Sequence, residues 1–412
     1  MMRLPAFVLL AVVSVAVLTG LGPSVWGQQE LPQPLPPELV AAWTKAGAKV
    51  GWIRTNREGD PEFRAGGEGK KGDVPAFRFS EWSNGVVGKL PQPQQGFGLY
   101  LYRTNLTDLE LKELAGLKHL QSLSLWTTKV TDAGLKELAE MEDLQVLDLR
   151  VTRVTDAGLK ELSGYKNLQA VSLSTMPITD AGLQVLARVK RLQSLKVSFT
   201  KITDAGLKHL LGLTGLYTLN LNGTEVTDGG LKELAKITTL QTLNLSQTKV
   251  TDAGLKELVG LKDLQSLAIW NTKVTDVGLK ELAKITSLQS LDLNNTKITD
   301  AGLKELGGHK SLQELNLTQT KVTDAGLKEL AGLGGLQGLY LPFTITDAGL
   351  KELAGYKGLQ RLLIGGPKVT DAGLKELKEL KSLETLMLLG TAVTDAGVAE
   401  LQKALPKIQI VR

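Results

Sequence analysis

The most regularly spaced polar residues in this 412-residue chain are the aspartates of a Thr-Asp pair, which occurs thirteen times. Successive aspartates lie 24 residues apart, except for one interval of 23 between Asp324 and Asp347. Carboxylates that converge can act as general acids or bases or as metal ligands. Carboxylates spaced this evenly belong to separate structural units, so a helix cap explains each pair better than an active site does. A row of metal ions along the aspartates is the alternative.

Other residues that could support catalysis are few. The three histidines, His119, His209 and His309, fall on or just after the predicted helices. The glycine-rich segment Arg64–Asp73 lacks the first glycine and the Ser or Thr of a P-loop. The absence of cysteine excludes zinc–thiolate, iron–sulfur and thiol chemistry. We therefore predict no catalytic residue, no metal site and no cofactor, and a protein that is not an enzyme.

One unit, Lys249 to Thr272, shows which elements must carry the Thr-Asp pairs. Apolar residues alternate with other residues over 266–270, which predicts a short strand with one buried face. Leucines recur every three positions over 255–261, which places them on one face of a helix. Gly260 suits a C-terminal helix cap. Neither element can bury its apolar face alone, so the units must stack into a solenoid with a continuous leucine core.

The sequence LQSLAIWNT at 264–272 resembles the leucine-rich-repeat signature LxxLxLxx(N/C)xL. The TDAGLKEL segments are similar to the ITDxGLxxL segment of the cysteine-containing repeat subfamily, and the near-identical copies resemble large secreted bacterial families. Here Thr mostly replaces Cys or Asn, and its hydroxyl can bond the backbone of the turn. The resemblance covers about three quarters of the chain. It implies an α/β horseshoe solenoid with a parallel sheet on the concave face and short helices on the convex face.

The chain before the repeats is expected to contain three further segments. Residues 1–27 combine one arginine, an apolar run and a plausible cleavage site, which predicts a secretory signal peptide. An uncleaved membrane anchor is the alternative. Residues 28–38 form a Pro-rich linker, and 39–97 are expected to fold as a small α+β N-terminal cap, or alternatively as a separate binding module. The segments KVGWIRT, PAFRF and GVVGKL look like strands of this cap. Residues 98–412 form the repeat domain, about 13 repeats and a terminal strand in LPKIQIVR.

Charge and cysteine content restrict the partners and the location. The formal net charge is +5, and most charged residues are evenly spread Lys-Glu pairs, which is not the pattern of a nucleic-acid-binding protein. A signal peptide predicts a protein that is secreted or located in the periplasm or cell envelope. The absence of disulfides favours a bacterial protein over an animal receptor. After signal cleavage, no segment is long and apolar enough to span a membrane.

The strand face is where function is expected, because its residues vary while the helices stay nearly constant. Large aromatic residues and arginine dominate protein interfaces. We therefore expect a protein ligand to bind these concave-face residues: Tyr100, Tyr102, Trp126, Asp148, Arg150, Lys196, Trp270, Asp292 and Tyr340. Packing of the aromatic cluster against the N-terminal cap is the alternative role for its residues. Leu363, Met387 and Leu389 form a separate apolar patch, which is either a covered end or a self-association surface.

Two other functions remain open. A carbohydrate or envelope polymer could stack on Trp126 and Trp270 beside the polar central columns of the face. A substrate adaptor of the F-box type is implied only by the subfamily resemblance, and a signal peptide is incompatible with a cytosolic ligase. The sequence does not identify the ligand.

Overall fold

The 24-residue period becomes one strand and one short helix per unit in the computed structural model, which describes residues 31–56 and 60–412. The predicted signal peptide, residues 1–27, lies outside the described residues. Every α-helix from α3 (Asp108–Leu111) onward begins at the aspartate of a Thr-Asp pair. The described chain divides into two compact units: an N-terminal unit that ends at Glu225, and a C-terminal unit, Val226–Arg412.

The N-terminal unit contains three strands before its repeats. Strand β1 pairs antiparallel with both β2 and β3, β3 pairs parallel with β4, and β4 to β9 then pair in parallel order. Its strands are β1 (Lys49–Thr55), β2 (Pro61–Ala65), β3 (Val74–Arg78), β4 (Phe97–Tyr100), β5 (Leu120–Ser124), β6 (Val146–Asp148), β7 (Ala170–Ser172), β8 (Ser194–Lys196) and β9 (Thr218–Asn220). Its helices are α2 (Pro37–Lys45), η1 (Val87–Lys89), α3, α4 (Asp132–Glu137), η2 (Gly158–Gly164), α5 (Asp180–Leu186), α6 (Asp204–Leu207) and η3 (Lys208–Gly212), where η denotes a 3₁₀ helix.

The C-terminal unit consists of repeats, and its strands β10 to β17 pair in parallel order. Its strands are β10 (Thr242–Asn244), β11 (Ser266–Ala268), β12 (Ser290–Asp292), β13 (Glu314–Asn316), β14 (Gly338–Tyr340), β15 (Arg361–Gly365), β16 (Thr385–Leu389) and β17 (Gln409–Val411). Its helices are α7 (Asp228–Leu234), α8 (Asp252–Leu255), η4 (Lys256–Gly260), α9 (Asp276–Leu282), α10 (Asp300–Leu306), α11 (Asp324–Glu329), η5 (Leu330–Gly332), α12 (Asp347–Leu350), η6 (Lys351–Gly355), α13 (Asp371–Glu376), η7 (Leu377–Glu379) and α14 (Asp395–Ala404).

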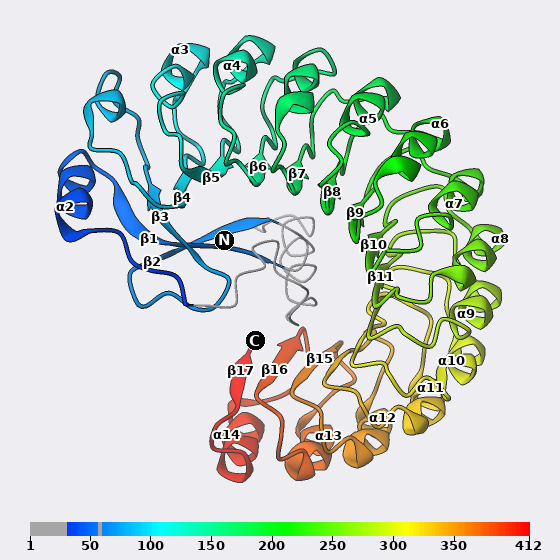
Figure 1. Ribbon diagram of the computed structural model, residues 1–412. Helices are drawn as coiled ribbons and strands as arrows, with labels where there is room; N and C mark the ends of the chain where they lie inside the picture. The colour runs from blue at the N-terminus through cyan, green and yellow to red at the C-terminus, as the bar shows by residue number, and fades with distance from the viewer. Residues whose placement is uncertain (1–30, 57–59) are drawn as a thin grey trace, which may run out of the picture. The chain divides into compact units, whose positions relative to one another are not determined.

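Within each unit the strands line the inner side of a curved stack and the helices line its outer side (Figure 1). The core lies between these two layers. Leu255 and Leu258 from the helical part of one repeat and Leu267 from its strand are all 1% exposed or less. Helices of one or two turns are marginal in water, so this stacking is what keeps them folded. The predicted leucine-rich-repeat solenoid is confirmed. The sheet face turned away from the helices is called the strand face below.

Two local predictions are wrong. The segment GVVGKL contains the 3₁₀ helix η1 rather than a strand. Gly260 does not form a left-handed helix cap, because it lies inside η4 and is not among the glycines with positive φ. The 3₁₀ turn ends that helix instead, since the Leu261 N–H donates to the Leu258 carbonyl at 2.9 Å.

The threonine that replaces Cys or Asn bonds the backbone of its own turn. The Thr272 hydroxyl donates to the Ile269 carbonyl at 2.6 Å, and Thr248 donates to the Leu245 carbonyl at the same distance. The residue before each of these threonines has positive φ, 54° at Asn271 for example. The hydroxyl therefore closes a tight turn within one repeat.

The aspartates of the Thr-Asp pairs link neighbouring repeats, which corrects the prediction that helix capping explains them. Thr299 provides the cap, since its hydroxyl oxygen accepts from the Ala301 N–H at 3.3 Å. The Asp276 carboxylate, one repeat earlier, accepts from the Thr299 N–H at 2.8 Å and from the Thr299 hydroxyl at 2.6 Å. A Cβ on Gly302 would lie 2.3 Å from the Asp276 Oδ1. Only glycine fits at position 302, because a larger residue would collide with the Asp276 carboxylate of the preceding repeat.

The two terminal repeats depart from this pattern because each lacks one neighbour. Glu110 stands at the glycine position of the first helix α3, which has no aspartate before it. Its carboxylate accepts from the Thr107 N–H at 2.7 Å and from the Asn84 side chain at 2.8 Å. Asp395, at the start of α14, binds Arg412 instead of a following threonine. The inter-repeat link thus ends in a different polar contact at each end.

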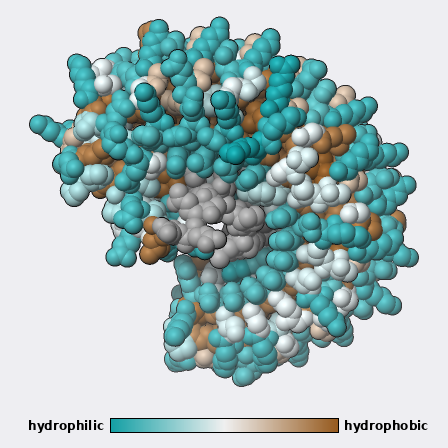
Figure 2. Space-filling model, in the orientation of Figure 1, coloured by the Kyte–Doolittle hydropathy of each residue, from teal (hydrophilic) through white to brown (hydrophobic). Residues whose placement is uncertain are grey.

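The visible surface is mostly hydrophilic, with hydrophobic residues in small groups (Figure 2). In the described ranges, no helix combines the length and apolar character needed to cross a membrane.

Candidate functional site

Two of the three histidines, His119 and His309, take part in structural contacts. The His309 ring is buried, and its Nε2 donates to the Ile285 carbonyl at 2.8 Å. His119 lies beside Asp143, with 3.2 Å between the Nδ1 and the carboxylate oxygen. Across residues 31–56 and 60–412, no group of three or more His, Asp or Glu side chains is placed to hold a metal ion.

The first repeats of the N-terminal unit have their strand face covered by the strands β1, β2 and β3. Val74 of β3 packs in one buried cluster with Val146 and Ala170, which belong to β6 and β7. Ile53 and Ala76 pack in a second cluster with Tyr100. The N-terminal strands therefore lie against a large part of the face on which the sequence predicts a binding site.

Aromatic residues continue from this contact along the strand face. The Tyr102 and Trp126 rings lie 4.4 Å apart, and the Arg150 guanidinium carbon lies 4.3 Å from the centre of the Trp126 ring. Arg150 also donates two hydrogen bonds to Asp148, each 2.8 Å long. Tyr102, Trp126 and Arg150 therefore form a cluster, and the positive charge of Arg150 is already paired with Asp148.

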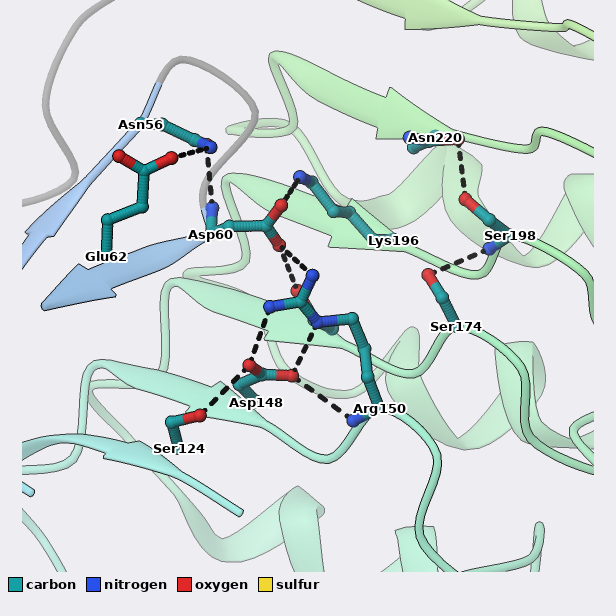
Figure 3. Close-up of polar contacts among 11 residues, drawn as sticks. Asn56, Asp60, Glu62, Ser124, Asp148, Arg150, Ser174, Lys196, Ser198 and Asn220 are labelled. Carbon is teal, nitrogen blue, oxygen red and sulfur yellow. Dashed lines mark hydrogen bonds and ion pairs between the residues drawn. The ribbon is translucent and has the colours of Figure 1, made fainter. Parts of the chain in front are cut away.

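Asp60 completes this pairing from the connection between β1 and β2 (Figure 3). Its carboxylate accepts from the Lys196 ammonium at 2.5 Å and from the Ser172 hydroxyl at 3.1 Å, and it lies 3.5 Å from Arg150. Burial alone would raise the pKa of the Asp60 carboxyl, but the Lys196 and Arg150 charges and these hydrogen bonds hold it below its ordinary value. Asp60 therefore binds as an anion and fastens the N-terminal strands to β7 and β8.

The sequence did not single out Asp60. The segment Glu58-Gly59-Asp60-Pro61 reads only as a turn, and Asp60 lies 136 residues from Lys196 along the chain. Tyr100, Asp148 and Lys196 are all at most 9% exposed, and Tyr102, Trp126 and Arg150 are half-buried. In the N-terminal unit, the predicted residues thus contact one another and the N-terminal strands, as the alternative role for the aromatic cluster requires.

The other predicted residues lie on the strand face of the C-terminal unit. Strand register places one column of side chains along the middle of this face: Asn244, Ala268, Asp292, Asn316, Tyr340, Leu363 and Met387. Trp270 follows Ala268 by two residues, so it lies on the same face, and it is half-buried. Trp270, Asp292 and Tyr340 are thereby brought onto one surface, at different positions along it.

Asp292 is a buried carboxylate, 8% exposed, at a position where two other repeats carry the asparagines Asn244 and Asn316. Its Oδ1 accepts from the Asn294 N–H at 3.0 Å, and the side chains of Asn244 and Asn316 bond their own turns in the same way at 3.0 Å. Burial raises the pKa of Asp292 to about 6, although the hydrogen bonds from Asn294 and Asn316 oppose the shift. An amide oxygen makes the same hydrogen bond at this position in other repeats, so the turn does not need a charge here.

The far end of the same face is apolar. Tyr340 and Leu363 form a buried cluster against which the half-buried Met387 and Leu389 pack. Phe343 is 51% exposed, and its ring lies over Gly365, where a Cβ would come within 2.0 Å of it. Burial and the nearby Glu314 charge raise the pKa of Tyr340 to about 12, so its hydroxyl stays protonated.

Comparisons with known proteins agree with this repeat organisation. A family model described as "Leucine Rich repeat" matches residues 192–211, 216–235, 236–259, 284–307 and 308–331. The fold is similar to that of an internalin from Listeria monocytogenes, with a TM-score of 0.54, 24% identity, and coverage of 73% of this chain and 82% of that one. A leucine-rich-repeat protein of Leptospira interrogans aligns with a TM-score of 0.48 and 21% identity, over 81% of this chain and 93% of that one.

No curated protein sequence matches the chain. The five matched segments fall on the 24-residue units, and those units fold as strand, turn and short helix in the order of this repeat class. The chain therefore contains leucine-rich repeats and has the fold of leucine-rich-repeat proteins.

Proposed function

We propose that this chain is a secreted bacterial scaffold without catalytic activity, which binds another protein on the strand face of its C-terminal unit. The observation that carries the proposal is the contrast between the two sides of the repeats. The helices repeat GLKEL with little change, while the strand-face column varies from Asn244 to Met387 and includes Asp292 and Tyr340. Stability requires no such variety, because each repeat already buries the same leucine core.

The C-terminal unit is favoured over the N-terminal unit because of what covers each face. In the N-terminal unit, β1 to β3 pack on the strand face and Asp60 pairs with Arg150 and Lys196. The C-terminal unit consists of repeats, and its own described residues include no such covering segment. Its face carries Trp270 and, at the far end, exposed Phe343, which are residue types that anchor protein interfaces.

The proposed location and the proposed lack of catalysis rest on the sequence and the fold. The predicted signal at residues 1–27 supports secretion or a place in the cell envelope. A strand face of polar, aromatic and apolar side chains supports binding, and the repeat fold is used mainly as a binding scaffold.

Affinity capture from the source organism's cell envelope and culture medium tests the proposal. The full chain, Trp270→Ala and Val277→Ala are used as baits, and the bound proteins are quantified by mass spectrometry. Val277 is the matched control because it is 67% exposed on helix α9, on the opposite side of the repeat. We expect a partner that the wild type and Val277→Ala retain equally and that Trp270→Ala loses at least fivefold. Equal retention by all three baits would rule out the strand face as the binding surface.

A further inference from the structure

We propose that the strand face of the C-terminal unit binds an extended peptide segment that places an arginine or lysine on Asp292 and Trp270 and an apolar side chain beside Phe343, Met387 and Leu389. The inference rests on the proposed function and specifies the chemistry of its partner. It depends on three features of the face: a charge that the fold does not use, the side chains around it, and the distance to the apolar end.

The charge on Asp292 is not required by the fold. Asn244 and Asn316 bond their turns as neutral side chains with the same geometry. Asp148, the other aspartate in this strand position, is bound by Arg150. Asp292, in contrast, has no ion-pair partner among the described residues, although it is 8% exposed. A buried carboxylate without a cation is costly, and a cation from a partner would remove that cost.

The neighbours of Asp292 suit a basic side chain. Ala268 is paired directly with Asp292 in the strand register, and its small side chain leaves the carboxylate without a bulky neighbour on that side. Trp270 lies two residues further on the same face, and an aromatic ring beside a carboxylate is a favourable environment for a guanidinium or ammonium group.

The spacing between the two ends of the site predicts the length of the segment. Asp292 lies on β12, whereas Gly365 under Phe343 lies on β15 and Met387 on β16. Three to four strand spacings correspond to roughly 14–19 Å. An extended peptide advances about 3.4 Å per residue, so this distance spans about four to six residues. The partner segment therefore carries its basic and apolar residues about four to six positions apart.

A library of random 12-residue peptides displayed on phage, selected against the full chain, tests this chemistry without knowledge of the natural partner. Affinities of the selected peptides are then measured for the wild type, Asp292→Asn and Trp270→Ala. Asp263→Asn serves as the control, because Asp263 is exposed and lies in the connection between η4 and β11. The Asp292→Asn variant should fold normally, since Asn244 and Asn316 occupy the equivalent positions of other repeats, and circular dichroism checks this.

We expect peptides with Arg or Lys about four to six positions from an apolar residue, bound at least tenfold more weakly by Asp292→Asn and within twofold by Asp263→Asn. Peptides that lose affinity for Trp270→Ala but bind Asp292→Asn at full strength would overturn the basic-residue inference and leave the proposed function intact. Failure to select any peptide, or peptides unaffected by every strand-face substitution, would contradict both.

Discussion

At Asp292, the carboxylate that we propose to bind a partner reduces the stability of the free protein. Its pKa is raised from 3.8 to about 6, mainly because burial disfavours the charged form. The folded state therefore holds the proton more tightly than the unfolded state does. Stability contributed by the protonated group is present below about pH 4 and is lost as the pH rises to about 6, a loss of up to about 3 kcal/mol. Binding sites commonly keep such groups at the expense of stability.

The variant Asp292→Asn should not show this loss, because asparagine stays neutral at every pH. We expect the variant to gain stability relative to the wild type as the pH rises from 4.5 to 7.5, by about 2 kcal/mol. Urea denaturation at a series of pH values measures the difference. The exposed Asp263→Asn variant should follow the wild type throughout. Parallel stability curves for the wild type and Asp292→Asn would show that the buried carboxylate carries no such cost.

The helix and turn of each repeat are held to the next repeat by the Asp-Thr-Gly link. The Asp276 carboxylate accepts two hydrogen bonds from Thr299, and Gly302 leaves room for it. Asp276→Ala should cost about 2 kcal/mol, because it removes two hydrogen bonds to a charged acceptor at a partly buried site. Gly302→Ala should also destabilise, because its Cβ would push the carboxylate away from Thr299.

The two substitutions disrupt the same contact, so the double variant should cost clearly less than the sum of the single variants. A double-mutant cycle in urea measures this coupling. Asp395→Ala is the matched control, because the last helix has no following repeat and Asp395 is 97% exposed at its side chain. Additive costs for Asp276→Ala and Gly302→Ala, or an equal cost for Asp395→Ala, would contradict the link.

The sequence predicts most of the secondary structure within a single repeat. The alternation around Leu267 predicts the strand, and the Thr-Asp pair predicts where the helix begins. The partner of each aspartate could not be predicted by considering one repeat, because the carboxylate crosses to the next one. The left-handed cap predicted at Gly260 is absent because a 3₁₀ turn closes the helix, and such a turn needs no left-handed residue.

For the whole molecule, sequence periodicity does not predict that the N-terminal strands β1 to β3 pack on the strand face. Strand β1 is predicted from KVGWIRT, whereas the contact of the N-terminal segment with the repeats depends on Ile53 of β1 and on Asp60 after it, which belong to no repeat. The candidate residues of the N-terminal unit lie on the strand face, as the strand register predicts, but the sequence does not predict their contacts with the N-terminal strands.

The ion pairs of Asp60 should matter for the N-terminal unit alone. Asp60→Ala removes the carboxylate bound by Lys196, which is 3% exposed, and should destabilise this unit by about 3 kcal/mol. Amide hydrogen exchange should accelerate in β6 to β8 and stay unchanged in β12 to β16. The double variant Asp60→Ala/Lys196→Met should recover part of this stability, because it also removes the buried ammonium group that Asp60→Ala leaves unpaired. Equal acceleration in both units would contradict this account.

The most direct test of the central claim is site-specific photocrosslinking of the strand face. A benzophenone amino acid is placed at Ser266, on the strand face, or at Val277, on helix α9, and each protein is illuminated with the source organism's envelope proteins. We predict a discrete crosslinked partner from position 266 that Asp292→Asn weakens, and no such product from position 277. Crosslinks from position 277 alone, or the same products from both positions, would contradict it.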